Sequence, residues 1–144
     1  MTHHTGVKTN FMALDVGKKR IGVAIASAYA RLPHPHATLL NDDTLWLTLA
    51  DLCHHETIGT LVVGLPRGLD GQETAQTAYC REFADEAMQR LGITVYLQDE
   101  ALTSVHAEAE LAERKASAGK GEIDSLAATY ILEDYLKEHH ETHV

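Results

Sequence analysis

Three acidic positions far apart in the chain stand where carboxylates are not expected: Asp15, the pair Asp99–Glu100, and Asp124. Asp15 interrupts the apolar run 11–16 (FMALDV), which is typical of a buried central strand. Because a buried, unpaired carboxylate is costly, Asp15 requires a hydrogen-bonding network, a cation or a metal ion. A salt bridge to Lys19 or Arg20 across a hairpin would satisfy it as well as a metal would.

Asp99 and Glu100 follow directly on the expected strand 93–97. The ends of strands in α/β sheets are where ligands usually bind. Adjacent strand residues point to opposite faces, so we expect one of the two carboxylates to face a given site. Both could equally be solvated residues that lead into a helix.

Asp124 lies in the first turn of the expected last helix. At about 100° per residue it falls between Ile131 and Tyr135, on the apolar face of that helix. An acid there would look into the core or into a site beside it, although a helix N-terminus also favours a carboxylate. Asp134 is on the same arc but roughly 15 Å farther along the helix, too far to share a site with Asp124.

These acids become a functional hypothesis only if the fold brings them together. Oxygen-rich clusters suit Mg²⁺ or Mn²⁺ rather than zinc. Two such ions can activate a water and stabilise the leaving oxygen of a phosphodiester. The chemistry that the acids suggest is therefore metal-assisted hydrolysis.

The hydrophobic pattern predicts the elements that must position these acids. Short apolar or alternating runs predict strands at 11–16, 21–26, 37–40, 60–65 and 93–97. Helices are expected from a cap at 41–43 to about residue 53, over 73–91 with Gly92 as C-cap, from Thr103 or Ser104 to about 115, and over 122–138. On the helix 73–91, one face should carry Ala75, Ala78, Tyr79, Phe83, Ala87 and Leu91. Residues 116–121 are expected to form a connector.

Three strands followed by alternating helices and strands imply a mixed five-stranded sheet, an antiparallel meander plus parallel strands, flanked by helices in an α/β fold. We find no repeat or linker that divides the 144 residues, so we expect one domain over 1–144, with flexible tails at about 1–9 and 138–144.

Composition restricts the class of protein. The chain is 44% hydrophobic, and its longest apolar runs are too short to cross a bilayer. Cys53 and Cys80 form no disulfide framework or CxxC motif, which favours a cytoplasmic location. A net charge of −9 alone argues against generic nucleic-acid binding, but the bases 18–20 and 114–120 gather locally, either as phosphate contacts or as solvated turns.

Four segments in order resemble the motifs of the YqgF/RuvX family of pre-16S rRNA nucleases, which is related to Holliday-junction resolvases. They are LDVGKKRIGVAIAS (14–27), LVVGLPRGLDGQE (61–73), DEALTSVHAEAEL (99–111) and GEIDSLAATYILEDYL (121–136). A D-x-G start with G-x-A also occurs in actin-like ATPases, but those need a large second domain for which 144 residues leave no room. The resemblance covers about residues 11–136 and implies an RNase H-like fold.

The resemblance implies that Asp15, Glu100 and Asp124 are catalytic and hold Mg²⁺ or Mn²⁺. It also implies RNA, namely pre-16S rRNA, as the partner, in a monomer or homodimer without membrane association. Candidate phosphate-binding residues are Lys19, Arg20, Arg67 and Lys120.

One position departs from the pattern: Ala101 stands where the family's third motif usually has Arg after Asp-Glu. Alanine cannot contact phosphate or steady an acid as Arg can, so Arg67 is considered as a substitute. The departure keeps open a nucleic-acid-binding protein without catalysis. A DNA-junction resolvase is the alternative within the nuclease class.

Overall fold

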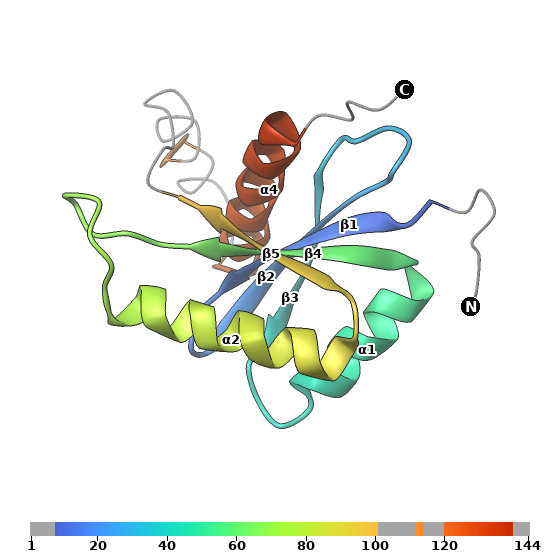
Figure 1. Cartoon of the computed structure of the whole chain (residues 1–144), viewed down its shortest axis with the longest axis horizontal. Helices are drawn as coiled ribbons and strands as arrows, with labels where there is room; N and C mark the ends of the chain where they lie inside the picture. The colour runs from blue at the N-terminus through green and yellow to red at the C-terminus, as the bar shows by residue number, and fades with distance from the viewer. Residues whose placement is uncertain (1–7, 101–111, 114–119, 140–144) are drawn as a thin grey trace.

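The structure, a computed structural model, describes residues 8–100, 112–113 and 120–139 (Figure 1). Its strands are β1 (Asn10–Val16), β2 (Arg20–Ala26), β3 (His34–Leu40), β4 (Ile58–Leu65) and β5 (Thr94–Asp99). Its helices are α1 (Leu45–His55), α2 (Ala75–Leu91) and α4 (Lys120–Glu138). The expected helix from Thr103 or Ser104 to about 115 lies largely outside the described residues. Within that range the structure describes only residues 112–113, and both are helical.

The five strands form one mixed sheet in the order β3-β2-β1-β4-β5. β1 pairs antiparallel with β2, and β2 antiparallel with β3. β4 lies parallel to both β1 and β5. The expected meander and parallel strands are therefore confirmed, and β1, which carries Asp15, is the central strand.

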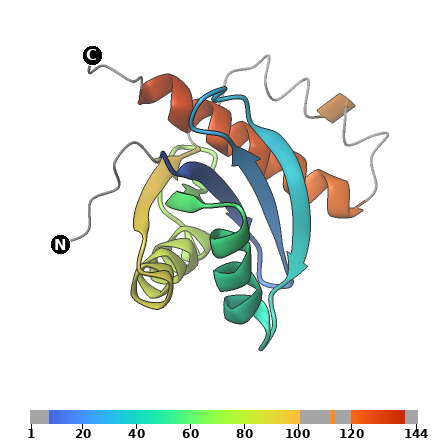
Figure 2. The ribbon, with the colours of Figure 1, turned by 90° about the vertical axis from the view of Figure 1, so that its right-hand side faces the viewer.

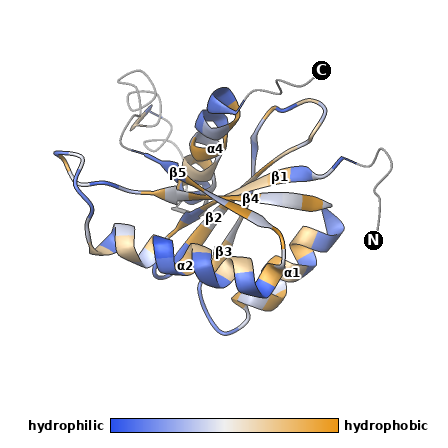
Figure 3. Ribbon diagram, viewed as in Figure 1, coloured by the Kyte–Doolittle hydropathy of each residue, from blue (hydrophilic) through white to orange (hydrophobic). Residues whose placement is uncertain are grey.

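Helices cover both faces of the sheet, with α1 and α2 on one side and α4 on the other (Figure 2). Strand alternation divides the core accordingly, because successive side chains point to opposite faces. Met12, Leu14 and Val16 pack with α1 and α2. Ala13 packs with Val62, Ala128 and other residues under α4. Figure 3 shows apolar residues gathered along the strands between these layers.

The α4 face is made of small residues, and this lets the helix lie close to the sheet. Ala13, Ala24 and Ala26 of β1 and β2 are fully buried beneath it. A glycine inside a strand is often a point of close backbone approach. At Gly22 a Cβ would overlap the backbone carbonyl of Asp124, so glycine is required for α4 to sit where it does.

Helix α1 begins later than expected, at Leu45, and ends at His55. Thr44 stands at the N-cap position without a side-chain cap, because Asp42 accepts hydrogen bonds from the Thr44 backbone N–H and hydroxyl. Asn41 instead donates to the Gly17 carbonyl and the Tyr79 hydroxyl. The polar residues expected to cap α1 are thus used to hold the preceding turn.

The buried face of α2 also differs from the expectation. Phe83 and Ala87 are buried as expected, but Ala75 and Ala78 are exposed. The remaining buried residues are Thr77, Cys80 and Ala84. Thr77 can be buried because its hydroxyl donates to the Pro66 carbonyl and takes part in a capping box with Thr74. Gly92 ends the helix in the left-handed conformation, as expected.

Two other boundaries shift toward the candidate acids. β5 extends to Asp99, so this residue belongs to the strand rather than following it. α4 begins at Lys120, so the expected connector 116–121 is wrong in its last two residues.

β3 begins at His34 and includes Pro35, which a strand at the edge of a sheet tolerates. No helix in the described part of the chain is long and apolar enough to span a bilayer.

Candidate active site

Asp15 projects from β1 on the face that α4 covers. Its neighbours Leu14 and Val16 belong to the opposite core, so strand alternation turns Asp15 toward α4. Its partner across the antiparallel pair is Gly22 of β2. On the other side, Leu14 pairs with Val63 of β4, and Gly64 follows in the same register. Asp15 is therefore flanked by two glycines, which leave space above the sheet.

Each glycine lies beneath one of the other two candidate acids. The backbone of Asp124 sits directly over Gly22. A Cβ on Gly64 would lie 2.7 Å from Oε2 of Glu100, so the Glu100 carboxylate rests on the Gly64 backbone. The structure thus brings Asp15, Glu100 and Asp124 to one region at the same end of the sheet.

Asp99 and Glu100 separate as strand alternation requires. Asp99 turns to Arg67 in the β4–α2 loop, with Arg67 Nη2 3.0 Å from its Oδ2 and Nε 3.3 Å from its Oδ1. Glu100 turns toward the α4 face, over Gly64. The two acids therefore point to opposite sides of the sheet, and Glu100 is the one on the side of Asp15.

The electrostatics of Glu100 reflect this crowding. Burial, and then the negative charge of Asp15, raise its pKa to about 7, with smaller effects from Asp134 and Asp99. Burial also raises the pKa of Asp134. Desolvation and like charge both disfavour the ionised carboxylate. A divalent cation would remove this penalty, because its charge favours ionised ligands.

Asp134 is a further acid near Glu100 that the sequence analysis did not connect with it. Its distance from Asp124 along the helix correctly separates those two residues, but α4 runs across the sheet and carries Asp134 close enough to Glu100 to affect its pKa. The packing of α4 on the sheet, which no sequence spacing reveals, brings the charge of Asp134 near Glu100.

Arg20 forms an ion pair with Asp124. Its Nε donates to Oδ2 of Asp124 at 2.8 Å, with side chains 41% and 22% exposed respectively. Arg20 therefore pairs with the acid on α4, whereas the sequence suggested a salt bridge with Asp15. Lys19 is exposed in the β1–β2 turn. Lys120 is the first residue of α4, and its side chain lies outside the described part.

The donor set fits a hard cation in its chemistry, since all three acids offer only oxygen. Within residues 8–100, 112–113 and 120–139, no three His, Cys, Asp or Glu side chains stand close enough to form a ready-made metal cluster. The pairing of Asp124 with Arg20 is one reason, since it directs that carboxylate to the guanidinium. Cys80 is not a further nucleophile, because burial, and then the charges of Glu100 and Asp15, raise its pKa to about 11.

Comparison with known proteins agrees with this architecture. The sequence model of the RuvX family, described as Holliday junction resolvase, matches residues 9–138. Two relatives carry the name "Putative pre-16S rRNA nuclease". The one from Cronobacter sakazakii is 37% identical over 132 residues, covering 89% of this chain and 96% of its own. The one from Sulfurihydrogenibium sp. (strain YO3AOP1) is 35% identical over 130 residues, covering 89% and 90%.

Solved structures show the same fold at low sequence identity. Thermus thermophilus RuvC in complex with a Holliday junction substrate superposes with a TM-score of 0.57 at 14% identity, covering 91% of this chain and 96% of that one. The Fowlpox virus resolvase in its complex with Holliday junction DNA gives 0.52 at 9% identity, covering 89% and 99%. The expected RNase H-like fold is confirmed, and the match over residues 9–138 shows that the chain belongs to the RuvX family.

Proposed function

We propose that this protein is a metal-dependent nuclease that hydrolyses phosphodiester bonds of pre-16S rRNA in the maturation of its 5′ end, in the cytoplasm. The observation that carries the proposal is that Asp15 of β1 and the Glu100 carboxylate lie together on the sheet face that α4 covers, with the backbone of Asp124 over Gly22, the partner of Asp15. The names of the curated relatives support the RNA substrate.

In this proposal Asp15, Glu100 and Asp124 hold Mg²⁺ or Mn²⁺. When bound, such ions activate a water and stabilise the leaving oxygen of the phosphodiester. The central strand carries Asp15, Gly64 lets the Glu100 carboxylate lie close to the sheet, and Gly22 lets the backbone of Asp124 do the same. Asp15 and Asp124 stand on β1 and α4, and Glu100 directly follows β5, so regular elements rather than long loops would hold the three acids.

Basic residues around the β1–β2 turn are proposed to receive the phosphate backbone. Lys19 is exposed there, and Arg20 stands beside Asp124 with 41% of its side chain exposed. Lys120 opens the helix that carries Asp124. This local group of bases gives a nucleic acid a binding surface despite the net charge of −9.

The test is cleavage of an RNA that carries the 5′ flank of 16S rRNA, with Mg²⁺ or Mn²⁺ and with EDTA. Asp15→Asn should lower the rate at least about 100-fold, because a metal ion supplies several kcal/mol of transition-state stabilisation. Asp85→Asn is a matched control, since Asp85 is exposed on α2 at the opposite face of the sheet. Cleavage by Asp15→Asn at the control's rate would contradict the assignment.

A DNA-junction resolvase is the second candidate, favoured by the description of the family model. A four-way DNA junction assayed beside the RNA separates the two, since the preferred substrate should be cut faster by the same Asp15-dependent site. A nucleic-acid-binding protein without catalysis remains the alternative outside the enzymes, because Ala101 replaces the family Arg. It predicts RNA binding without any metal-dependent cleavage.

A further inference from the structure

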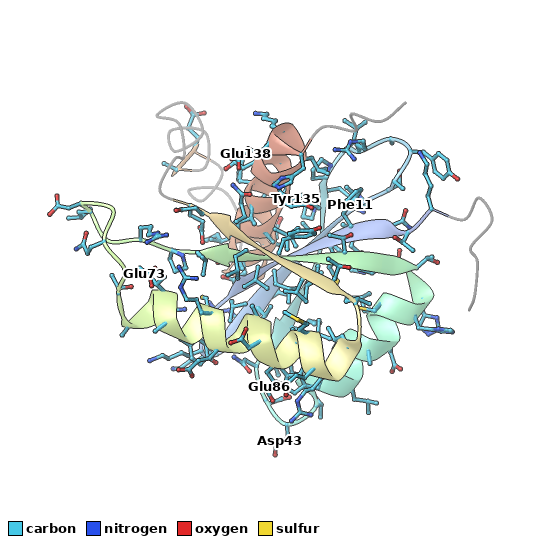
Figure 4. The ribbon with its side chains drawn as sticks, in the orientation of Figure 1. Phe11, Asp43, Glu73, Glu86, Tyr135 and Glu138 are labelled. Atoms are coloured by element: carbon cyan, nitrogen blue, oxygen red, sulfur yellow. The ribbon has the colours of Figure 1, made fainter. Side chains whose placement is uncertain are left out.

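Arg67, in the loop between β4 and α2, is engaged by two carboxylates. Its guanidinium makes a two-bond contact with Asp99 at 3.0 and 3.3 Å, and its Nη1 lies 3.4 Å from Oε2 of Glu73. Its side chain is 20% exposed. This loop leaves the end of β4, and Figure 4 labels Glu73 in it just before α2.

The same network continues along α2 and rests on an ordered loop. Glu73 also receives two hydrogen bonds from Arg81, at 2.6 and 3.2 Å. Within the loop, Gly68 N–H donates to the Gln72 carbonyl at 2.8 Å. Thr77 of α2 holds the Pro66 carbonyl with its hydroxyl. The Arg67 guanidinium therefore contacts Asp99 from a loop that hydrogen bonds hold near both of its ends.

Asp99 is the residue immediately before Glu100, so its position constrains the candidate ligand. In the parallel pair of β4 and β5, Asp99 stands beside Leu65. The Glu100 N–H donates to the Leu65 carbonyl at 3.0 Å, continuing the ladder. The backbone of Glu100 is thus held by β4, while the side chain that precedes it is held by Arg67.

We propose that Arg67 is a positioning residue that clamps Asp99 and thereby fixes Glu100 for divalent-ion binding, an inference that rests on the proposed function. A planar guanidinium that engages both oxygens of a carboxylate restrains its orientation as well as its distance. Fixing Asp99 on the loop side leaves Glu100 directed to the opposite side, over Gly64. The position that follows Glu100 carries Ala101, so the steadying charge comes from a different segment of the chain.

This role differs from the phosphate contact that the sequence suggests for Arg67. Two carboxylates already balance its charge, and a phosphate would have to compete with both. Lys19, in contrast, lies exposed in the β1–β2 turn. The positioning role and the phosphate-binding role of Arg67 make opposite predictions for Mn²⁺ affinity and for the salt dependence of RNA binding.

The experiment measures Mn²⁺ binding alone, by titration calorimetry at fixed pH, on the full chain. The variants are Arg67→Ala, Arg67→Lys, which keeps the charge but loses the fork, and Arg81→Ala as matched control. Arg81 is also an arginine paired with Glu73, and its two hydrogen bonds go to Glu73, whereas those of Arg67 go to Asp99. RNA binding without divalent ions is measured in parallel by fluorescence anisotropy at several salt concentrations, and thermal unfolding in EDTA reports on folding.

The expected result is a loss of Mn²⁺ affinity of about 10-fold or more for Arg67→Ala, as for other partners of metal ligands. Loss of the Arg67 charge alone would raise Mn²⁺ affinity, because removing a cation beside several acids favours cation binding. Arg67→Lys should lose affinity in the same direction, and Arg81→Ala should stay within about twofold of the wild type. The salt dependence of RNA binding should be unchanged by Arg67→Ala.

Mn²⁺ affinity equal to or above that of the wild type in both Arg67 variants would overturn the inference and leave the proposed function intact. So would a drop of about one in the salt slope of RNA binding, which marks a lost phosphate contact. If Arg67→Ala does not fold, Arg67→Lys alone decides. A wild-type protein that binds no Mn²⁺ would contradict the proposed function, and the inference with it.

Discussion

Replacing Glu100 by Gln should stabilise the metal-free protein above neutral pH. Burial, and then the charge of Asp15, raise the pKa of Glu100 from 4.5 to about 7 in the folded state. Below pH 4.5 the residue is protonated in both folded and unfolded chains, so it contributes no pH-dependent term. Between pH 4.5 and 7 the folded state binds the proton more tightly, so the stability of the wild type falls as pH rises.

The size of the effect follows from the shift. At about 1.36 kcal/mol per pKa unit, ionised Glu100 lowers the free energy of unfolding at pH 8 by at most about 3 kcal/mol. Because Glu100 is partly exposed, the loss is smaller than this limit. We therefore expect Glu100→Gln to recover about 1–3 kcal/mol. For a chain of this size, each kcal/mol of stability shifts Tm by roughly 2–4 °C. Glu100→Gln should therefore unfold at a higher temperature than the wild type at pH 8, and at nearly the same temperature at pH 4.

The assay is thermal unfolding in EDTA from pH 4 to 8, followed by circular dichroism. Glu82→Gln is the matched control, because Glu82 is exposed on α2. Adding Mn²⁺ at pH 8 should reverse the order, since ligand binding to the folded state stabilises the wild type more than a variant without this carboxylate. If Glu100→Gln and Glu82→Gln follow the same curve across the pH range, the crowding of acids around Asp15 is not as described.

Three further predictions concern the surroundings of the site. Gly22→Ala should destabilise the fold by about 1–3 kcal/mol in urea unfolding, because its Cβ would overlap the Asp124 backbone; an unchanged midpoint would mean that α4 lies farther from β2. Arg20→Ala should lower the salt slope of RNA binding by about one, while its half-exposed ion pair with Asp124 should cost less than about 1 kcal/mol of stability; an unaltered slope would remove Arg20 from the phosphate surface. Cys80→Ala should cleave RNA at the wild-type rate, since burial raises the pKa of this thiol to about 11, and a large loss of activity would contradict its assignment as a packing residue.

The part of the site that lies within single elements is predictable from the sequence. Asp15 stands out because a charge in an apolar strand needs a partner, and strand alternation assigns it to one face. Asp124 follows in the same way from helical periodicity, and the structure places it over that strand's neighbour. For both residues a local pattern determines the direction of the side chain, and the fold class follows from the order of such patterns.

Contacts between elements are not predictable in this way. Arg20 is close to Asp15 in the chain, but it pairs with Asp124 from the far end of the sequence. Asp134 of α4 acts electrostatically on Glu100, which follows β5, and this proximity depends on how α4 packs on the sheet. The sequence does hold one signal for this packing, namely Gly22 inside a strand, which marks a close approach of backbones.

The arrangement explains why a chain with a net charge of −9 can carry a nucleic-acid site. Burial, and then the like charges placed around it, raise the pKa of Glu100, so the metal-free fold is less stable than it would be with a neutral residue there. Binding sites commonly hold groups that are unfavourable until a ligand compensates them. A divalent cation would relieve this repulsion and present positive charge to a phosphodiester, while Arg20 would be free to exchange Asp124 for a phosphate. Under the proposed function, the acids would first bind the metal ion and the bases would then bind the phosphate, so tight RNA binding should require the metal ion.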